Sequence, residues 1–136
     1  HCRSDEEYSP THIARRMKHY YKELLACFAG LPLDHEWEPY VFVHAGGDLG
    51  KKDWHDSSEE DFLWIREPFH KKKNRSGKTI VFGHTPTFYL HGDNDRSDLW
   101  ISDDKIGIDG GAVYGGSLHG VVFDKTGLKA DHIIQK

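Results

Sequence analysis

The chain has 136 residues, of which 37% are hydrophobic and 29% are charged. This composition is typical of a globular protein and excludes a disordered, collagen-like or coiled-coil chain. The formal net charge is −4, so we expect no general nucleic-acid-binding surface. No apolar run approaches the roughly 18–20 residues that a transmembrane helix needs, and we therefore expect no membrane partner.

Cysteine and histidine are the informative residue types. Cys2 and Cys27 form no CxxC pair, which favours a reducing compartment and predicts a cytoplasmic protein. The chain has 11 histidines. Because histidine is the commonest metal ligand and titrates near neutral pH, the positions of these residues carry much of the functional argument.

The N-terminal part of the chain predicts one long amphipathic helix over residues 10–29. Ser9 and Pro10 are a typical N-cap and first helical residue. Gly30 and Pro32 mark the end of the helix. Apolar residues follow the spacing of one buried helical face, and they are Ile13, Met17, Tyr20, Tyr21, Leu24, Leu25 and Phe28.

A strand, a short helix and a second strand are predicted next. Residues 40–43 form an apolar run that enters a glycine-rich turn, which is typical of a buried strand. Overlapping capping boxes at residues 57–61 begin a short helix that ends before Pro68. Residues 70–78 are expected to form a polar, basic loop, and residues 79–82 a second buried strand.

The rest of the chain predicts short strands joined by tight turns. The hairpin turns are expected at residues 103–104 and 124–127. The candidate strands are residues 99–102, 105–108, 117–123 and 128–134. This order predicts an α/β (α+β) fold with mostly antiparallel strands after residue 98. We see no repeat and no linker, so we expect residues 1–136 to form a single unit.

Two histidines directly follow the two apolar strands. His44 follows Val43, and His84 follows Gly83. Sites in layered α/β proteins gather beyond the carboxyl ends of strands, where loops converge on a rigid sheet. Two neighbouring strands would therefore bring both imidazoles to one metal. The alternative is that each His is a hydrogen-bonded structural residue, and the spacing alone leaves both interpretations open.

A glycine-rich loop and an arginine add further candidate groups. Residues 109–116 contain four glycines around Tyr114, whose phenol would hydrogen-bond a ligand. Arg66 follows Trp64 on the short helix, and its rigid fork would grip a phosphate. The alternatives are a glycine-rich turn with one packing aromatic, and an exposed helical arginine.

Four motifs in order resemble a known family. They are FVHAG at residues 42–46, WIR at 64–66, VFGHTP at 81–86 and IDGGAVYGG at 108–116. Together they resemble the C-terminal half of a calcineurin-like metallophosphoesterase, in particular the bacterial branch of the serine/threonine protein phosphatases. The resemblance covers about residues 20–124. It implies a β-sandwich flanked by helices, of which this chain forms the C-terminal part.

The resemblance implies a metal-dependent phosphoric-monoester hydrolase. It implies two divalent metal ions (Mn, Fe or Zn) in the complete enzyme, with His44 and His84 as two ligands of one of them. Arg66 would hold the substrate phosphate, and Tyr114 would line the site next to it. The implied substrate is a phosphoprotein or a small phosphoester.

The family signatures GDxHG, GDxxDRG and GNHE/D do not occur in this chain. In the family they supply the remaining metal ligands and the general acid. Two ions about 3.5–4 Å apart need bridging oxygens, which two imidazoles do not provide. We therefore expect an inactive C-terminal portion with an empty or partly occupied metal site, which needs its N-terminal half or another chain. Asp48 and Asp109 are the carboxylates that would overturn this expectation.

Two other functions stay open at this point. A dinucleoside polyphosphate hydrolase is a related branch of the same family, although the GHTP form of the second motif favours the phosphatase branch. A non-catalytic interaction domain that retains the fold is the alternative from another class of protein.

Overall fold

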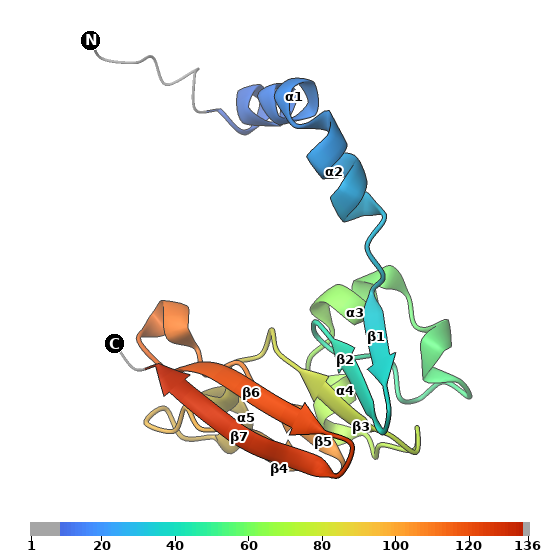
Figure 1. Ribbon diagram of the computed structural model, residues 1–136, viewed down its shortest axis with the longest axis vertical. Helices are drawn as coiled ribbons and strands as arrows, with labels where there is room; N and C mark the ends of the chain where they lie inside the picture. Colours follow the sequence, from blue (N-terminus) through green and yellow to red (C-terminus); the bar gives the residue numbers. More distant parts are fainter. Residues whose placement is uncertain (1–8, 135–136) are drawn as a thin grey trace. The chain divides into compact units, whose positions relative to one another are not determined.

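The computed structural model describes residues 9–134 (Figure 1). The chain divides into two compact units, residues 1–32 and 33–136, and each is described by itself. That the whole chain belongs to one catalytic domain stays a prediction.

Unit 1 contains two short helices, α1 (Pro10–Tyr20) and α2 (Lys22–Ala29). The Ser9 hydroxyl caps α1 by accepting a hydrogen bond from the backbone N–H of His12 at 3.2 Å. The prediction of one unbroken helix was wrong at Tyr21, whose φ of −124° and ψ of 31° interrupt the helix. Two adjacent tyrosines, Tyr20 and Tyr21, are weaker helix formers than the lysines and the glutamate near them, which fits a break at this point.

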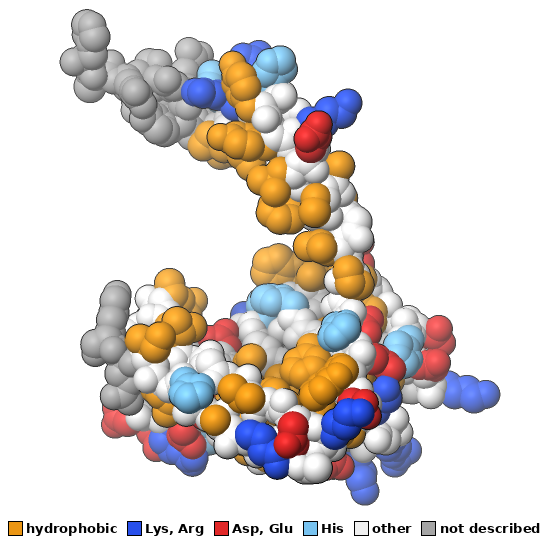
Figure 2. All heavy atoms as spheres, viewed as in Figure 1, with side chains coloured by type: hydrophobic (Ala, Val, Ile, Leu, Met, Phe, Trp, Pro, Cys, Tyr) orange, Lys and Arg blue, Asp and Glu red, His pale blue; other side chains and the backbone are white. Residues whose placement is uncertain are grey.

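The described residues of unit 1 do not themselves bury the predicted apolar face of this helix. No residue of α1 or α2 is buried, and Ile13, Leu24 and Phe28 are 47%, 44% and 57% exposed. Figure 2 shows hydrophobic side chains gathered along these helices. Because none of these side chains is buried, packing of apolar residues within unit 1 stabilises it little. Helices of this length are marginal when they are isolated in water.

Unit 2 is built on a five-stranded sheet with the order β1-β2-β3-β5-β4. The central strands β2, β3 and β5 are parallel to one another, whereas β1 and β4 are antiparallel edge strands. The predicted mixed α/β class is confirmed. The strands are β1 (Asp34–Trp37), β2 (Tyr40–Val43), β3 (Thr79–Phe82), β4 (Trp100–Ser102) and β5 (Lys105–Gly107).

Helices cover one face of this sheet. The β2-to-β3 connection contains η2 (Trp54–Asp56), α3 (Glu59–Trp64) and α4 (Glu67–Lys71). This connection contributes Trp54, Phe62 and Phe69 to the core on that face. They pack against alternate residues of the two strands, which are Val41, Val43, Ile80 and Phe82. Through these core contacts, the β2-to-β3 connection packs α3 and α4 against the strands whose ends carry the candidate histidines.

A hairpin contributes to the core on the other face. It consists of β6 (Leu118–Asp124) and β7 (Gly127–Ile134), which are antiparallel. Phe123 of β6 packs against Tyr40, Val81 and Ile106 of the sheet. Successive residues of a strand face opposite sides of the sheet. Residues 41–43 and 80–82 are all apolar because β2 and β3 pack into a core on each face. Two smaller elements, α5 (Thr87–His91) and η3 (Ala112–Tyr114), lie in the connections.

Several sequence predictions can be compared with these elements. The strands at residues 40–43 and 79–82, the capping box of Ser58 and Asp61, and the antiparallel hairpins after residue 98 are confirmed. The loop predicted at residues 70–78 begins later, because α4 extends to Lys71. The sequence did not predict β1 or α5, since β1 is a polar edge strand and α5 has only five residues.

Candidate functional site

The two candidate histidines meet at one edge of the sheet. His44 directly follows β2, and His84 comes two residues after β3, which is parallel to β2. The centroids of the two imidazole rings are 5.1 Å apart. The backbone N–H of Gly83 donates a hydrogen bond of 2.9 Å to the carbonyl of His44, which holds the two strand ends together. The predicted approach of these histidines is therefore confirmed.

The backbone at His84 is unusual. Its φ is 65°, in the left-handed region that residues other than glycine rarely adopt. The N–H of Thr85 donates to the carbonyl of Gly83 at 2.7 Å, which makes His84 the centre of a tight three-residue turn. Strain of this kind costs on the order of 1–3 kcal/mol and gathers at functional sites. The turn places the ring edge-on to Trp64, with the ring centroids 5.3 Å apart.

The environment of His84 favours a neutral imidazole. Burial is the largest cause that lowers the pKa of His84, and the charge of Arg66 and the neighbouring His44 lower it further. Within the part of the chain that the structure describes, Nε2 of His84 is buried and has no hydrogen-bond partner. A neutral imidazole with an unused nitrogen is the form that binds a metal ion. The donor set therefore fits the predicted role of a ligand.

The other ligands of a metal centre are not assembled around this pair. Among residues 9–134, no group of three or more His, Cys, Asp or Glu side chains is placed to hold a metal ion. The carboxylate of Asp48 instead accepts hydrogen bonds from the N–H of Gly50 at 2.9 Å and from Lys72 Nζ at 3.0 Å. The carboxylate of Asp109 accepts one from the N–H of Gly111 at 2.9 Å. The described residues thus offer two imidazoles as candidate ligands.

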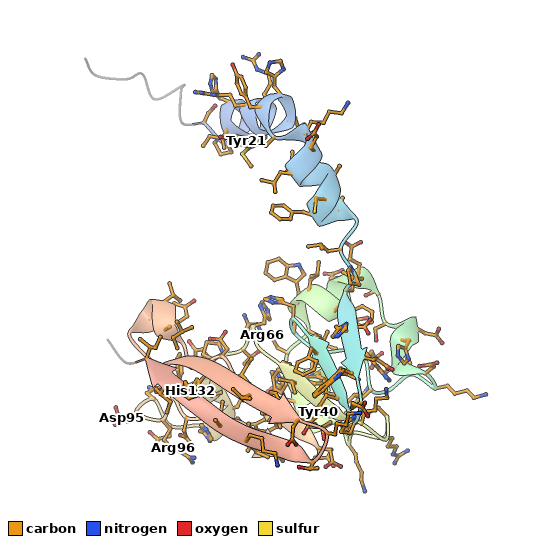
Figure 3. The ribbon with its side chains drawn as sticks, in the orientation of Figure 1. Tyr21, Tyr40, Arg66, Asp95, Arg96 and His132 are labelled. Atoms are coloured by element: carbon orange, nitrogen blue, oxygen red, sulfur yellow. The ribbon has the colours of Figure 1, made fainter. Side chains whose placement is uncertain are left out.

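Arg66 does not belong to the predicted short helix, because α3 ends at Trp64. It lies at the junction between α3 and α4, immediately before the first residue of α4 (Figure 3). Its Nη1 donates a hydrogen bond of 3.3 Å to the hydroxyl of Thr85, the residue after His84. The guanidinium is exposed, and it has several further N–H donors in a rigid plane. Arg66 is therefore brought next to the histidine pair with donors suited to an anion.

Tyr114 lies in a different part of unit 2. It belongs to η3, between Gly111 and Gly115, whose φ angles of 70° and 91° require glycine. Its side chain is 74% exposed, and its ring is 6.4 Å from the ring of Phe88. It lines a cavity together with Phe88, Asn94, Asp95 and Ser97, rather than the cavity beside Arg66. The predicted role of Tyr114 next to the phosphate stays a prediction.

A cavity beside Arg66 was not predicted from the sequence. It has a volume of about 480 Å³ and lies between α4, α5 and β4. Its lining comes from segments that are separated in the sequence, so no local motif reveals it. The lining residues are Arg66, Glu67, His70, Lys71, Thr85, Tyr89, Leu90 and Trp100. Burial is the largest cause that lowers the pKa of His70, to about 4, so this imidazole is neutral.

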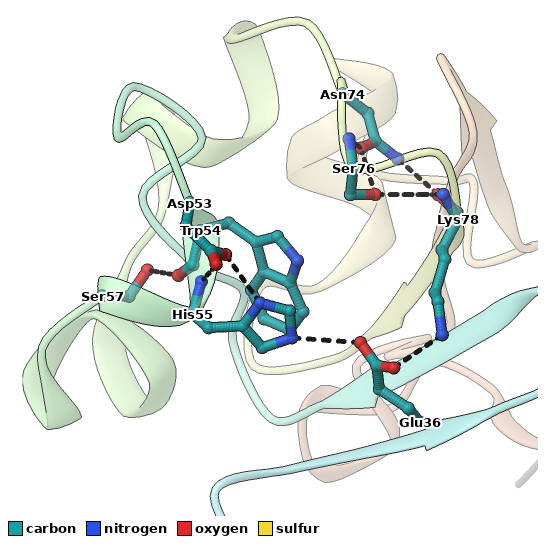
Figure 4. A network of polar contacts seen from close by, with 8 residues as sticks. All are labelled: Glu36, Asp53, Trp54, His55, Ser57, Asn74, Ser76 and Lys78. Carbon is teal, nitrogen blue, oxygen red and sulfur yellow. Dashed lines mark hydrogen bonds and ion pairs between the residues drawn. The ribbon is translucent and has the colours of Figure 1, made fainter.

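A second polar cluster lies apart from these residues and has a structural role (Figure 4). Nδ1 of His55 lies 2.7 Å from Asp53 Oδ1, and Nε2 lies 3.0 Å from Glu36 Oε1. The other oxygen of Glu36 accepts a hydrogen bond from Lys78 Nζ at 2.6 Å. These contacts join η2 to β1 and to the residue before β3. Each charged group has a partner of opposite charge, so the cluster leaves few unpaired polar groups for a ligand.

No family model matches the chain, and no curated protein matches it. The resemblance to metallophosphoesterases therefore rests on the four motifs and on the geometry around His44, His84 and Arg66. Across residues 9–134, no helix is both long and apolar enough to cross a membrane.

Proposed function

We propose that the chain is the C-terminal portion of a metal-dependent phosphoric-monoester hydrolase. The proposed class is the calcineurin-like metallophosphoesterases, in the branch of the serine/threonine protein phosphatases. The observation that carries the proposal is the convergence of His44, His84 and Arg66 at one end of the sheet. A cytoplasmic location, proposed from the cysteine content, belongs to the same proposal.

His44 and His84 would hold one divalent ion, with Mn, Fe or Zn as the candidates. When bound, a two-metal centre of this class supplies Lewis-acid activation of water and of the phosphoryl group. The turn at His84 fixes the direction of its ring, and the unpaired Nε2 is the atom that it offers as a ligand. Burial and the nearby Arg66 keep this ring neutral, as the lowered pKa of His84 indicates, so no proton has to leave before it binds.

Arg66 would bind the substrate phosphate. Thr85 holds one guanidinium nitrogen, and the remaining donors would pair with phosphoryl oxygens in the planar arrangement that arginine favours. As charge develops on these oxygens during displacement, a positioned guanidinium stabilises them without reorganising. Arg66 would therefore act on the transition state, whereas the histidines act through the metal.

The proposal requires residues beyond the two imidazoles. Signatures that would supply the other ligands are absent from the 136 residues, so an N-terminal half or another chain would complete the centre. The proposed partners are that half and a phosphoprotein or small phosphoester substrate. The dinucleoside polyphosphate hydrolase and the non-catalytic domain stay as the alternative predictions.

Hydrolysis of p-nitrophenyl phosphate tests the proposal. The full natural chain that contains these residues should hydrolyse it only with divalent metal, and a chelator should abolish turnover. The 136-residue chain alone should show no turnover above background. Metal-independent hydrolysis by the full chain would contradict the proposed mechanism. Turnover by the 136 residues alone that is abolished by His84→Ala would instead show that they hold a complete centre.

A further inference from the structure

The cavity that Tyr114 lines is separate from the candidate metal site. It has a volume of about 380 Å³ and lies between α5, the loop after α5 and the glycine-rich loop. Ligand pockets typically have volumes of roughly 300–1,000 Å³. Neither Arg66 nor the two candidate histidines line this cavity. Its lining comes from Phe88 of α5, from Asn94, Asp95 and Ser97, and from residues 114–116.

Two aromatic rings form the apolar part of this lining. Phe88 packs directly on the glycine-rich loop, because a Cβ on Gly111 would lie only 2.5 Å from its ring. The backbone N–H of Tyr114 donates a hydrogen bond of 2.8 Å to the carbonyl of Gly111. The two rings are nearly perpendicular, at 82°. The same loop therefore positions both rings, and Tyr114 remains mostly exposed and accessible to a ligand.

The loop after α5 forms the polar part of the lining. The backbone N–H of Arg96 donates to the carbonyl of Asp93 at 3.1 Å, which closes a turn within this loop. The hydroxyls of Ser97 and Ser117 lie 2.8 Å apart and join the loop to the residue after the glycine-rich loop. These contacts hold the two sides of the cavity in fixed positions before any ligand binds.

The polar side of the cavity carries an unpaired negative charge. Asp95 lies next to Arg96 on this loop (Figure 3). Arg96 is neutralised by Asp98, to which its Nε and Nη2 donate at 3.2 and 2.8 Å. Within residues 9–134, the carboxylate of Asp95 has no ion-pair or hydrogen-bond partner. A free carboxylate beside an exposed aromatic ring favours a cation, which the face of a tyrosine ring also attracts.

A guanidinium group matches this arrangement better than an ammonium group. It is planar, stacks on aromatic rings and presents paired N–H donors to a carboxylate. The ammonium group of lysine is a compact and strongly hydrated point charge. The oxygens of Asn94 and Ser97 line the same cavity and can accept the remaining N–H donors.

We infer that this cavity binds an arginine side chain of a peptide or protein partner. The plane of the guanidinium lies against the Tyr114 ring, and its edge pairs with the carboxylate of Asp95. The inference does not rest on the proposed function, because the cavity includes none of the residues assigned to the metal or to the phosphate.

Binding of short peptides to the 136-residue chain tests the inference. Three capped tripeptides, with arginine, citrulline or lysine between two glycines, are titrated separately and followed by NMR. Citrulline has the shape of arginine but no charge. We expect the arginine peptide to bind about tenfold more tightly than the citrulline peptide, because citrulline lacks both the ion pair and the cation–π contact. The arginine peptide should also bind more tightly than the lysine peptide.

Two variants locate the binding within this cavity. Asp95→Asn should abolish the preference for arginine over citrulline. Asp104→Asn is its matched control, because Asp104 is exposed in the turn between β4 and β5, and asparagine tolerates its φ of 52°. Tyr114→Ala should weaken binding of the arginine peptide, whereas Tyr89→Ala should not, because Tyr89 is 65% exposed and lies outside this cavity.

Equal binding of the arginine and citrulline peptides would overturn the inference, and so would tighter binding of the lysine peptide. A preference for arginine that persists in Asp95→Asn would also overturn it, since the arginine would then bind elsewhere. The comparison of peptides uses the unaltered chain, so it stands even if a variant fails to fold. Neither metal nor phosphate takes part, so failure of the proposed hydrolase would appear separately, as the absence of metal-dependent hydrolysis by the full chain.

Discussion

At the residue scale, His84 combines a left-handed backbone with a ring nitrogen that is buried and unpaired in the described structure. The backbone costs on the order of 1–3 kcal/mol, and an unsatisfied buried polar atom costs a similar amount. Glycine at this position would avoid both costs. The proposed role of His84 as a metal ligand would use Nε2 and would account for a histidine at this position.

Replacing Arg66 and replacing His84 should have different effects on metal content and on activity. In the full natural chain, Arg66→Ala should keep the metal content and lower kcat/KM by about 10²–10³, because it removes a charged donor to the transition state. His84→Ala should lose metal and activity together. Metal analysis and steady-state kinetics of both variants measure this difference.

Arg75→Ala is the control, since Arg75 is an exposed residue of the loop before β3. It should behave as the wild type in both measurements. An Arg66→Ala enzyme within about threefold of the wild type, equivalent to only about 0.7 kcal/mol, would contradict the role of Arg66 as a phosphate ligand.

His55 gives the stability of unit 2 a pH dependence. Its hydrogen bond to Asp53 is the largest cause that raises the pKa of His55, and Glu36 adds to it. A raised folded-state pKa means that the stabilisation is fully present below the unfolded value of about 6.5. This stabilisation is lost as the pH rises through the pKa that His55 has in the folded state.

His55→Gln should therefore lower the free energy of unfolding more at pH 6 than at pH 9. Urea denaturation at the two pH values measures this difference. Asp53→Asn should reduce the same pH-dependent part, because it removes the larger cause of the shift. A stability difference between His55→Gln and wild type that does not change with pH would contradict this account.

At the scale of elements, α4 depends on a buried lysine of β5. Lys105 is only 1% exposed, and its Nζ donates to the carbonyls of Phe69, His70 and Lys72 at 3.2, 2.9 and 2.7 Å. These carbonyls lie at the end of α4, where a helix leaves acceptors without partners of its own. Because Arg66 stands immediately before α4, Lys105 also helps to fix the position of the phosphate-binding candidate.

Lys105→Met should therefore destabilise unit 2 by about 3 kcal/mol, since it leaves buried acceptors unpaired. Lys125→Met is the matched control, because the Lys125 side chain is 71% exposed in an ion pair with Glu38. That exposed change should stay within about 0.5 kcal/mol. Urea denaturation of both variants measures the two effects, and equal stabilities would contradict the structural role of Lys105.

The elements that the sequence predicts well have strong local patterns. Residues 41–43 and 80–82 are apolar in both strands because both faces of these strands pack into a core. Asp103 and Asp104 form a turn with φ angles of 51° and 52°. The polar strand β1 has no such pattern. The break at Tyr21 is also not visible in the apolar spacing, which continues through it.

At the scale of the whole molecule, topology explains which parts of the site are predictable. His44 and His84 meet because two adjacent parallel strands end at the same edge, and each strand is recognisable on its own. The cavity beside Arg66 depends on how α4, α5 and β4 pack together, which no local pattern specifies. Tyr114 has a recognisable loop, but the path of that loop carries it to another cavity.

The most direct test of the central claim is a titration of the 136-residue chain with Mn²⁺, followed through the imidazole signals in the NMR spectrum. A paramagnetic ion broadens the signals of the groups closest to it. We expect the His44 and His84 signals to broaden first, before that of His55, and His84→Ala to weaken the effect at His44. If the His55 signal broadens first, or if His44 responds equally in the His84→Ala variant, the shared metal site of His44 and His84 is contradicted.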